Sequence, residues 1–287
     1  MQNFKLKSYC KINLFLKVFR RGNNDYHNIQ SLITFCKLHD VISIAKTKLS
    51  KDKINFSGKF KKNINIKRNT ITKVLYLLRK KNFLNRKFFK IDVKKNIPHG
   101  SGLGGGSSNA AVLLNFFNLK MNLKINKKKL KKLAAQVGFD VPISLENKNT
   151  FLTGEKNKII RIKKKLKLNI IIVYPNVICS TTKIYKKNKN FSLTKRKFKS
   201  SIKNNNKLLT YLKKETNDLE KIVVKLYPKI GELIDFIKDQ KGCYFSRITG
   251  SGSACIGIFS NIKSAIYTRK LIKLKFPKYW SVVSKTI

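Results

Sequence analysis

Five of the chain's 14 glycines fall within the seven residues from Gly100 to Gly106. Glycine weakens the interior of a helix or a strand, so a cluster this dense needs a local reason. The alternating run FFKIDVK before the cluster predicts a strand, and the alanine-bearing run SSNAAVLLNFF after it predicts a helix. Because the loop joins two elements directly, a flexible linker is the weakest explanation, and a turn or a close approach to a ligand is favoured.

A glycine loop that opens a helix suits a phosphate group, because it presents backbone N–H groups and the positive end of the helix dipole. Gly100, Gly102 and Gly105 satisfy the pattern G-x-G-x-x-G, but the region NLKMNLKINKKK lacks the acidic residue that a dinucleotide fold would place there. The glycines are followed by G-S-S rather than G-K-[ST], and the protein-kinase motifs VAIK, HRD and DFG are absent from the sequence. The sequence therefore predicts a phosphate-binding loop of another type.

The charge of the chain raises a second class of function. Lys and Arg total 65 against 13 Asp and Glu, a formal net charge of +52. Such an excess is typical of nucleic-acid or membrane-surface partners. The lysines, however, are spread along the chain among asparagines and isoleucines, the residues that AT-rich codons supply, and no nucleic-acid-binding signature accompanies them. We attribute the charge to compositional drift and expect no nucleic acid and no membrane as partner; a basic nucleic-acid-binding protein remains the alternative from a different class.

Cysteine spacing and hydropathy bear on location. The five cysteines, at positions 10, 36, 179, 243 and 255, show no C-x-x-C pairing, which fits a reducing compartment. The N-terminal segment lacks the continuous apolar core of a signal peptide, and no apolar stretch approaches membrane-spanning length. We expect a soluble, cytoplasmic protein; the sequence does not predict its oligomeric state.

Three segments carry the clearest secondary-structure patterns. NTITKVLYLLRKK predicts a helix capped by Asn69, with Ile71, Val74, Leu75 and Leu78 on one face. QSLITFCKLHDVISIAKTKL predicts a pair of strands, and NDLEKIVVKLYP predicts a helix in which Glu220 answers an asparagine cap three residues earlier. Strands and helices alternate irregularly along the chain, which predicts an α+β fold in two lobes.

The glycine loop resembles a motif of a known family. PHGSGLGGGSSNAA, from Pro98, is similar to the second motif of the GHMP kinases, which include galactokinase and the homoserine, mevalonate and phosphomevalonate kinases. YCKINLFLKV resembles the first motif, with Tyr9 and Cys10 in place of the usual Pro-Ala, and ITGSGSACIGIF resembles the third. The resemblance implies an ATP-dependent kinase with Mg²⁺ and a two-lobed GHMP-kinase fold. Its N-terminal lobe, residues 1–153, would hold a mixed sheet and helices, and its C-terminal lobe, residues 154–287, would be an α/β sandwich.

One branch of the family matches more closely. The segments KINLFL, DYHNIQS, GSGLGGGSSNAA and GFDVP resemble, in order, the motifs of the branch that acts in the non-mevalonate route to isopentenyl diphosphate. Members of that branch phosphorylate the 2-hydroxyl of a methylerythritol linked to cytidine diphosphate, so the expected partner is a small-molecule cytidine-diphosphate substrate. Asp25 departs from the branch, which has glycine there. The alternative is a GHMP kinase of the homoserine or mevalonate type, against which Tyr26, His27 and GFDVP argue.

The resemblance implies two catalytic residues. On its own, Lys11 is one of many lysines on a solvated strand face, and Asp140 is an aspartate in a turn. The family motifs instead place Lys11 facing the transferring phosphoryl group and give Asp140 the task of orienting the attacking hydroxyl. Phosphoryl transfer depends mainly on positioning and charge neutralisation, which suits a lysine and an ionised carboxylate.

The resemblance also implies two sets of binding residues. Ser107 and Ser108 could equally cap the helix, and residues 250–253 could form an ordinary hairpin turn. In the family's arrangement Tyr26 stacks on the cytosine ring, His27 reads its polar edge, and Tyr185 covers its opposite face. The residues expected to bind ATP are Asn69, Lys95, Pro98, His99, Gly100, Ser101, Gly102, Leu103, Gly104, Gly105, Gly106, Ser107 and Ser108. Those expected to bind substrate are Asn13, Tyr26, His27, Tyr185, Gly250 and Ser251. The ligands of Mg²⁺ are not predicted.

Overall fold

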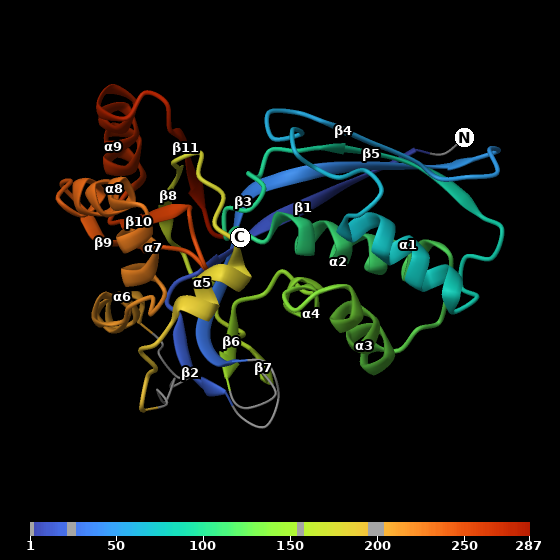
Figure 1. Ribbon diagram of the computed structural model, residues 1–287, viewed down its shortest axis with the longest axis horizontal. Helices are drawn as coiled ribbons and strands as arrows, with labels where there is room; N and C mark the ends of the chain where they lie inside the picture. Colours follow the sequence, from blue (N-terminus) through green and yellow to red (C-terminus); the bar gives the residue numbers. More distant parts are fainter. Residues whose placement is uncertain (1–2, 22–26, 154–157, 195–203) are drawn as a thin grey trace. The chain divides into compact units, whose positions relative to one another are not determined.

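The computed structural model describes residues 3–21, 27–153, 158–194 and 204–287 (Figure 1). The chain divides into two compact units that interleave along the sequence. Unit 1 comprises Met1–Lys11, Leu38–His99 and Gly104–Asn147, and unit 2 comprises Ile12–Lys37, Gly100–Leu103 and Lys148–Ile287. A mixed sheet and a separate antiparallel sheet accompany the helices, which confirms the expected α+β class.

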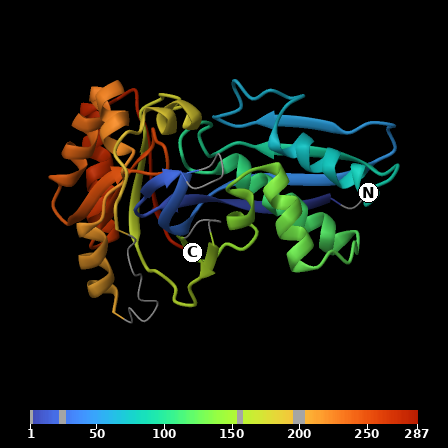
Figure 2. The same cartoon turned by 60° about the horizontal axis from the view of Figure 1, so that its bottom comes forward.

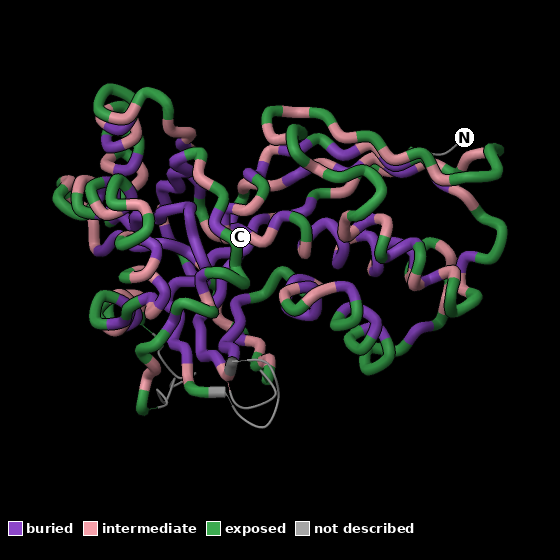
Figure 3. Tube along the Cα trace, in the orientation of Figure 1, coloured by how far each residue is buried: buried purple, intermediate pink, exposed green. Residues whose placement is uncertain are grey.

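Unit 1 packs helices on a twisted sheet. The second half of β3 (His27–Thr47) pairs antiparallel with β5 (Phe88–Lys94), and β4 (Lys53–Ser57) runs parallel to β5. β1 (Asn3–Asn13) also pairs with β3. The helices are α1 (Thr70–Lys80), α2 (Gly105–Lys120), α3 (Lys127–Val137) and the short α4 (Val141–Ser144). The apolar faces of β3, β5 and these helices form one core, in which α2 is buried along most of its length (Figure 3).

Helix α1 has the cap and the face that its sequence predicts. The Asn69 carboxamide oxygen accepts hydrogen bonds from the backbone N–H groups of Ile71 and Thr72, at 2.9 and 3.1 Å. The buried residues of the helix are the four on the predicted apolar face: Ile71, Val74, Leu75 and Leu78. The helix prediction is therefore confirmed.

The expected pair of strands between residues 30 and 49 is wrong, because β3 is a single strand of 21 residues. The segment has no glycine, proline or asparagine near its middle to make a hairpin turn. Its central charged residue, Asp40, is fully buried and accepts hydrogen bonds from the backbone N–H groups of Asn96 and Ile97. Since the carboxylate has partners inside the fold, the strand continues through it.

Unit 2 contains the antiparallel sheet, in the order β11-β8-β10-β9. Its strands are β8 (Asn169–Tyr174), β9 (Cys243–Ile248), β10 (Cys255–Phe259) and β11 (Trp280–Lys285). Helices α8 (Pro228–Lys238) and α9 (Ile262–Lys275) pack against this sheet (Figure 2). The unit also holds α5 (Thr181–Lys187), α6 (Asn205–Lys214) and α7 (Glu220–Leu226). The first half of β3 pairs with β2 (Lys17–Arg21) and β6 (Thr150–Thr153), and β6 pairs with β7 (Lys158–Arg161).

The two units do not follow one cut in the sequence. Residues up to Lys37 of β3 belong to unit 2 and residues from Leu38 onward to unit 1, so one strand contributes to both. The division into an N-terminal lobe, residues 1–153, and a C-terminal lobe, residues 154–287, remains a prediction. Within the described ranges, no helix combines the length and the apolar character needed to cross a bilayer.

Asp52 ties α1 to the strands of unit 1. Its two carboxylate oxygens accept from the Arg79 guanidinium at 2.6 and 2.8 Å, and one of them also accepts from the Phe89 backbone N–H at 2.9 Å. Replacing Asp52 with asparagine removes the charge and turns an amide donor toward the guanidinium. We expect the free energy of unfolding, measured by urea denaturation, to fall by about 1–3 kcal/mol.

Asp92 provides the matched control for this prediction. It lies 3.7 Å from the Lys90 ammonium, and both side chains are about half exposed. An exposed ion pair contributes less than about 1 kcal/mol, so Asp92→Asn should change the unfolding free energy little. Equal losses in the Asp52 and Asp92 variants would contradict the structural role of the Asp52–Arg79 pair.

Candidate active site

Lys11 and Asp140, the two expected catalytic residues, form an ion pair within unit 1. The Lys11 Nζ lies 3.2 Å from Asp140 Oδ2. The Lys11 side chain is only 4% exposed at the end of β1, whereas the Asp140 side chain is 33% exposed. Asp140 is the N-cap residue of α4, yet its side chain makes no capping hydrogen bond. The carboxylate is therefore directed to the lysine and partly to solvent rather than to the local turn.

The start of α2 lies against the same lysine. Gly104 is the N-cap residue, with φ +67°, and a Cβ there would lie 3.1 Å from the Cβ and Cε of Lys11. No side chain caps this helix. The interpretation of Ser107 and Ser108 as N-caps is wrong, because both lie inside the first turn. Backbone N–H groups at an uncapped helix start can bind an anion, so this part of the loop retains the chemistry that the sequence predicts.

Lys95 adds a second buried cation next to this helix start. Its ammonium pairs with the Asp40 carboxylate, and the Lys95 Nζ would lie 3.4 Å from a Cβ at Gly105. Partial desolvation, together with the nearby Lys95 charge, lowers the pKa of His99, which favours its neutral form. Sequence reasoning missed Asp40. The available signal was a single acidic residue within a long apolar strand, which needs a partner if it is buried.

The N-terminus of α1 is joined to the first turn of α2. The Thr70 hydroxyl donates to the Gly106 carbonyl at 2.8 Å. The Asn69 carboxamide caps α1 through its oxygen, and its nitrogen donates to the carbonyls of Asn65 and Ile66. A contact between Asn69 and ATP remains a prediction.

The first half of the glycine cluster belongs to unit 2 and packs on the third motif. Gly102 has φ +80°, and a Cβ there would lie 2.2 Å from the Thr249 carbonyl oxygen. The neighbouring Ser101 carbonyl accepts a hydrogen bond from the Ala254 backbone N–H at 3.0 Å, and the Leu103 side chain is fully buried. A Cβ at Gly100 would lie 2.7 Å from the Ile178 side chain. At Gly102 the fold itself requires glycine, and a side chain at Gly100 would force Ile178 to move, whatever the ligand.

The expected substrate residues of unit 2 gather around the same turn. The Asn13 backbone N–H donates to the Thr249 hydroxyl at 2.9 Å, and its carboxamide nitrogen donates to the Ser31 hydroxyl at 2.8 Å. A Cβ at Gly250 would lie 3.5 Å from the Asn13 carboxamide oxygen. The Ser251 hydroxyl is hydrogen-bonded to the Thr181 hydroxyl at 2.9 Å. The third motif is thus a turn hydrogen-bonded to two other segments, through the Asn13 backbone N–H and the Thr181 hydroxyl.

The aromatic residues expected around the cytosine ring are only partly observed. Tyr185 lies in α5 and is half-buried. Tyr26 lies outside the described residues, and of His27 only the backbone, at the start of β3, is described. The stacking roles of Tyr26 and Tyr185 and the polar role of His27 remain predictions.

The expected capping box at residues 217–220 is wrong. Helix α7 begins at Glu220, after Leu219 as N-cap, and no side-chain capping hydrogen bond is made. The side chains of Asn217 and Glu220 instead form hydrogen bonds with the backbone of Ile248, and that of Asp218 with the backbone of Val18. The sequence analysis did not predict these contacts.

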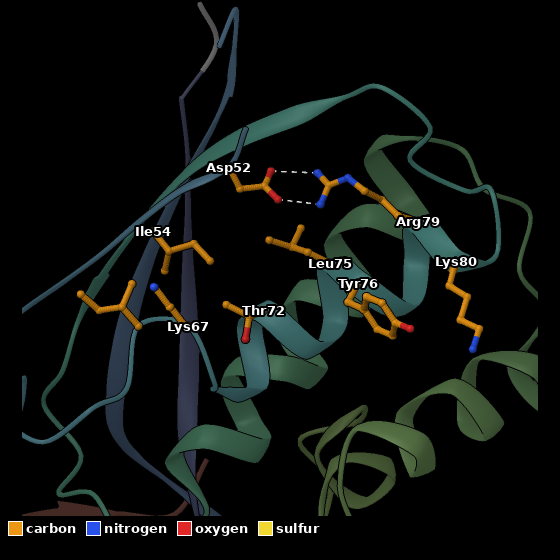
Figure 4. Close-up of a pocket in the computed structure, with 9 residues that line it drawn as sticks. Asp52, Ile54, Lys67, Thr72, Leu75, Tyr76, Arg79 and Lys80 are labelled. Carbon is orange, nitrogen blue, oxygen red and sulfur yellow. Dashed lines mark hydrogen bonds and ion pairs between the residues drawn. The ribbon is translucent and has the colours of Figure 1, made fainter. Parts of the chain in front are cut away.

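A cavity of about 690 Å³ lies between β4 and α1 in unit 1 (Figure 4). The Asp52–Arg79 pair spans it at one end, and Leu75 and Ile54 line its apolar side (Figure 4). None of the expected site residues is among its lining residues, which are Asp52, Ile54, Ile66, Lys67, Thr72, Leu75, Tyr76, Arg79 and Lys80.

Comparison with known proteins extends over the whole chain. Residues 69–148 match the family described as "GHMP kinases N terminal domain", and residues 195–269 match "GHMP kinases C terminal". The chain is 41% identical over 289 residues to a 4-diphosphocytidyl-2-C-methyl-D-erythritol kinase of Pelagibacter ubique, with 100% of both chains covered. It is 32% identical to a protein of the same name from Wolbachia pipientis wMel, covering 98% of this chain and 97% of that one.

Solved structures with low sequence identity share the fold. A 4-(cytidine 5'-diphospho)-2C-methyl-D-erythritol kinase matches with a TM-score of 0.75 at 21% identity, covering 98% of this chain and 99% of that chain. A homoserine kinase from Cytophaga hutchinsonii matches with a TM-score of 0.73 at 14% identity, covering 100% and 95%. These likenesses support the expected two-lobed architecture.

Gly102 and Gly106 separate the two reasons for glycine in the cluster. A Cβ at Gly102 collides with backbone, whereas a Cβ at Gly106, in the first turn of α2, meets nothing closer than the Thr70 side chain at 3.6 Å. We expect Gly102→Ala to lower the free energy of unfolding by at least about 2 kcal/mol, through the clash and the positive φ. Gly106→Ala should leave the unfolding free energy unchanged or raise it by up to about 1 kcal/mol. Urea denaturation of both variants provides the measurement, and similar values would show that packing does not select glycine at Gly102.

Proposed function

Because the chain belongs to the 4-diphosphocytidyl-2-C-methyl-D-erythritol kinase family of GHMP kinases, we propose that it phosphorylates the 2-hydroxyl of 4-diphosphocytidyl-2-C-methyl-D-erythritol with ATP. The observation that carries the choice of substrate is 41% identity to a kinase of that name across the full length of both chains. Structures of homoserine and mevalonate kinases match at 14% and 12% identity, a level that speaks for the fold alone. The reaction would be a step on the non-mevalonate route to isopentenyl diphosphate.

The family is one of kinases, so ATP is the phosphate donor. We assign its phosphates to the start of α2, since Gly104 has no competing side-chain cap and Lys95 lies beside Gly105. Two features therefore favour negative charge at this place, the helix dipole and a buried ammonium. The remaining residues of the loop, from Pro98 to Ser108, would shape the binding site around them.

Lys11 and Asp140 would act on the reacting atoms. In the proposed step, the substrate hydroxyl oxygen attacks the γ-phosphorus of ATP, the bond to the bridging oxygen breaks, and ADP leaves. Asp140 would orient the hydroxyl and accept its proton through the carboxylate that faces solvent. The Lys11 ammonium would stabilise the charge on the transferring phosphoryl group, and it also holds the carboxylate at 3.2 Å.

Mg²⁺ would supply charge neutralisation on the phosphates. No group of three or more His, Cys, Asp or Glu gathers in the described ranges of the chain. That composition suits Mg²⁺ bound mainly by nucleotide phosphates and water, because such ions need only one or two protein oxygens. Asp140 and the hydroxyl of Ser107 or Ser108 are the protein groups that would contact the ion.

In unit 2, we propose that Asn13, Gly250 and Ser251 contact the substrate through the braced turn of the third motif. The cytidine ring would lie against Tyr185 and Tyr26, with His27 at its polar edge. We further propose a cytoplasmic enzyme without a nucleic-acid partner, since its lysines follow no binding motif.

A comparison of three substrates, each assayed separately, tests the proposed function. Purified protein with ATP and Mg²⁺ is given 4-diphosphocytidyl-2-C-methyl-D-erythritol, homoserine or mevalonate, and ADP release is measured. We expect kcat/KM for the cytidine compound to exceed the others by at least about 10⁴-fold, because buried groups that bind the nucleotide would have no partner in the smaller alcohols. Faster turnover of homoserine or mevalonate would overturn the substrate assignment. Specific DNA binding at physiological salt would instead favour the alternative class.

The ion pair provides a second test. Asp140→Asn and Lys11→Met should each lower kcat by roughly 10²-fold or more while the Kd of the cytidine compound changes little, since both groups act mainly as charge redistributes. Because the two side chains are in contact, the double variant should lose less than the product of the single losses. Circular dichroism checks that each variant folds. A kcat near that of the wild type in Asp140→Asn would remove this residue from the mechanism.

A further inference from the structure

The segment Asn217–Glu220 completes the open edge of a strand. In the four-stranded sheet β9 lies at the edge, and its last residue, Ile248, pairs with Cys255 of β10. The Thr249 N–H donates to the Ala254 carbonyl, so by the antiparallel pattern both backbone polar groups of Ile248 face away from β10. A buried strand edge of this kind needs other partners.

Two side chains of the segment are those partners. The Asn217 carboxamide nitrogen donates to the Ile248 carbonyl at 3.1 Å, and Glu220 Oε2 accepts from the Ile248 N–H at 2.8 Å. Asn217 is only 3% exposed, and its carboxamide oxygen accepts from the Leu219 N–H at 3.0 Å. Both ends of the carboxamide are therefore engaged, which fixes its orientation.

The same carboxamide reaches one step further, into the turn of the third motif. Its nitrogen also donates to the Gly250 carbonyl, at 2.8 Å. Gly250 has φ +59°, and a Cβ there would lie 3.1 Å from the Gly102 carbonyl oxygen. One buried amide thus holds two carbonyl groups, one on each side of Thr249, the residue whose hydroxyl receives the Asn13 N–H. The position of the turn depends on this amide.

The last residues of the first motif, 16–18, hold the segment and the preceding Thr216 on the other side. The Leu16 N–H donates to the Thr216 carbonyl at 3.1 Å, and the Asp218 N–H donates to the Leu16 carbonyl at 2.9 Å. Asp218 Oδ2 accepts from the Val18 N–H at 2.9 Å, and Asp218 Oδ1 lies 3.3 Å from the Lys17 ammonium. The segment therefore connects residues 16–18 of the first motif to the turn of the third motif within unit 2.

We propose that Asn217 is a positioning residue of the kinase reaction, whose amide holds the turn Thr249–Ser253 in the one conformation that binds the acceptor substrate. This inference rests on the proposed function, in which Gly250 and Ser251 contact that substrate. Without the amide, the Ile248 and Gly250 carbonyls lose their shared donor, and the turn samples other conformations. If the competent conformation falls to about a tenth of the population, the apparent affinity for the acceptor falls about tenfold.

Asn149 offers a matched control in the same unit. It is 7% exposed, its carboxamide nitrogen donates to the Lys164 carbonyl at 2.8 Å, and its oxygen accepts from the Thr34 hydroxyl at 2.7 Å. Asn149→Ala therefore removes a buried amide of the same kind without touching the turn. A loss of global stability would affect both variants alike.

The first measurement is hydrogen–deuterium exchange and needs no substrate. In Asn217→Ala, amides of residues 249–254 should exchange at least about tenfold faster than in the wild type, while Asn149→Ala should leave them unchanged. Exchange in that turn that is unchanged in Asn217→Ala, or equally accelerated in both variants, would overturn the inference. Should Asn217→Ala fail to fold, Asn217→Ser carries the same comparison.

The second measurement is steady-state kinetics with ATP and 4-diphosphocytidyl-2-C-methyl-D-erythritol. Asn217→Ala should raise KM for the cytidine compound about tenfold and change KM for ATP by less than about twofold, a split that a general loss of folded enzyme does not produce. Faster exchange with both KM values unchanged would overturn the positioning role. If the wild type itself does not phosphorylate the cytidine compound, the proposed function fails, and the exchange experiment alone decides whether Asn217 holds the turn.

Discussion

A fully buried carboxylate determines how the chain enters the glycine loop. Asp40 binds the Lys95 ammonium and the backbone N–H groups of Asn96 and Ile97, directly after β5 ends. A buried charge without such partners would cost several kcal/mol, so strand β3, the end of β5 and the Lys95 side chain are constrained together. The ammonium is thereby held beside Gly105, where α2 begins. The contribution of Lys95 to the phosphate site proposed for the loop depends on this interaction.

Acidic residues are scarce in this chain, and those of the described site segments have specific partners. Asp140 pairs with Lys11, Asp218 binds Lys17 and the Val18 N–H, and Glu220 receives the Ile248 N–H. Burial raises the pKa of Glu220, while its hydrogen bond from Ile248 and the Arg247 charge oppose that rise. Against a formal net charge of +52, each of these acids makes a defined contact that its loss would remove. The defined electrostatic contacts of these site segments therefore centre on their carboxylates.

The glycine cluster meets two separate physical demands. At Gly102 a Cβ would overlap the Thr249 carbonyl oxygen, so packing within unit 2 excludes every other residue. At Gly104 the positive φ and the adjoining Lys11 side chain limit the residue, whereas at Gly106 there is room for a methyl group. Close approach of a phosphate can therefore explain glycine at positions 104–106, but it is not needed to explain glycine at position 102.

Local patterns in the sequence determined the loop between strand and helix and the cap and apolar face of α1. These depend on periodicity and on hydrogen bonds between residues a few positions apart, which a single sequence displays. Lys11 and Asp140 were identified only through their resemblance to family motifs. Tertiary structure alone decided that β3 is one strand, that Asp40 is the partner of Lys95, and that Asn217 serves the edge of β9 instead of capping α7. In each case a buried polar group found a partner far away in the chain, and only folding determines which groups become buried together.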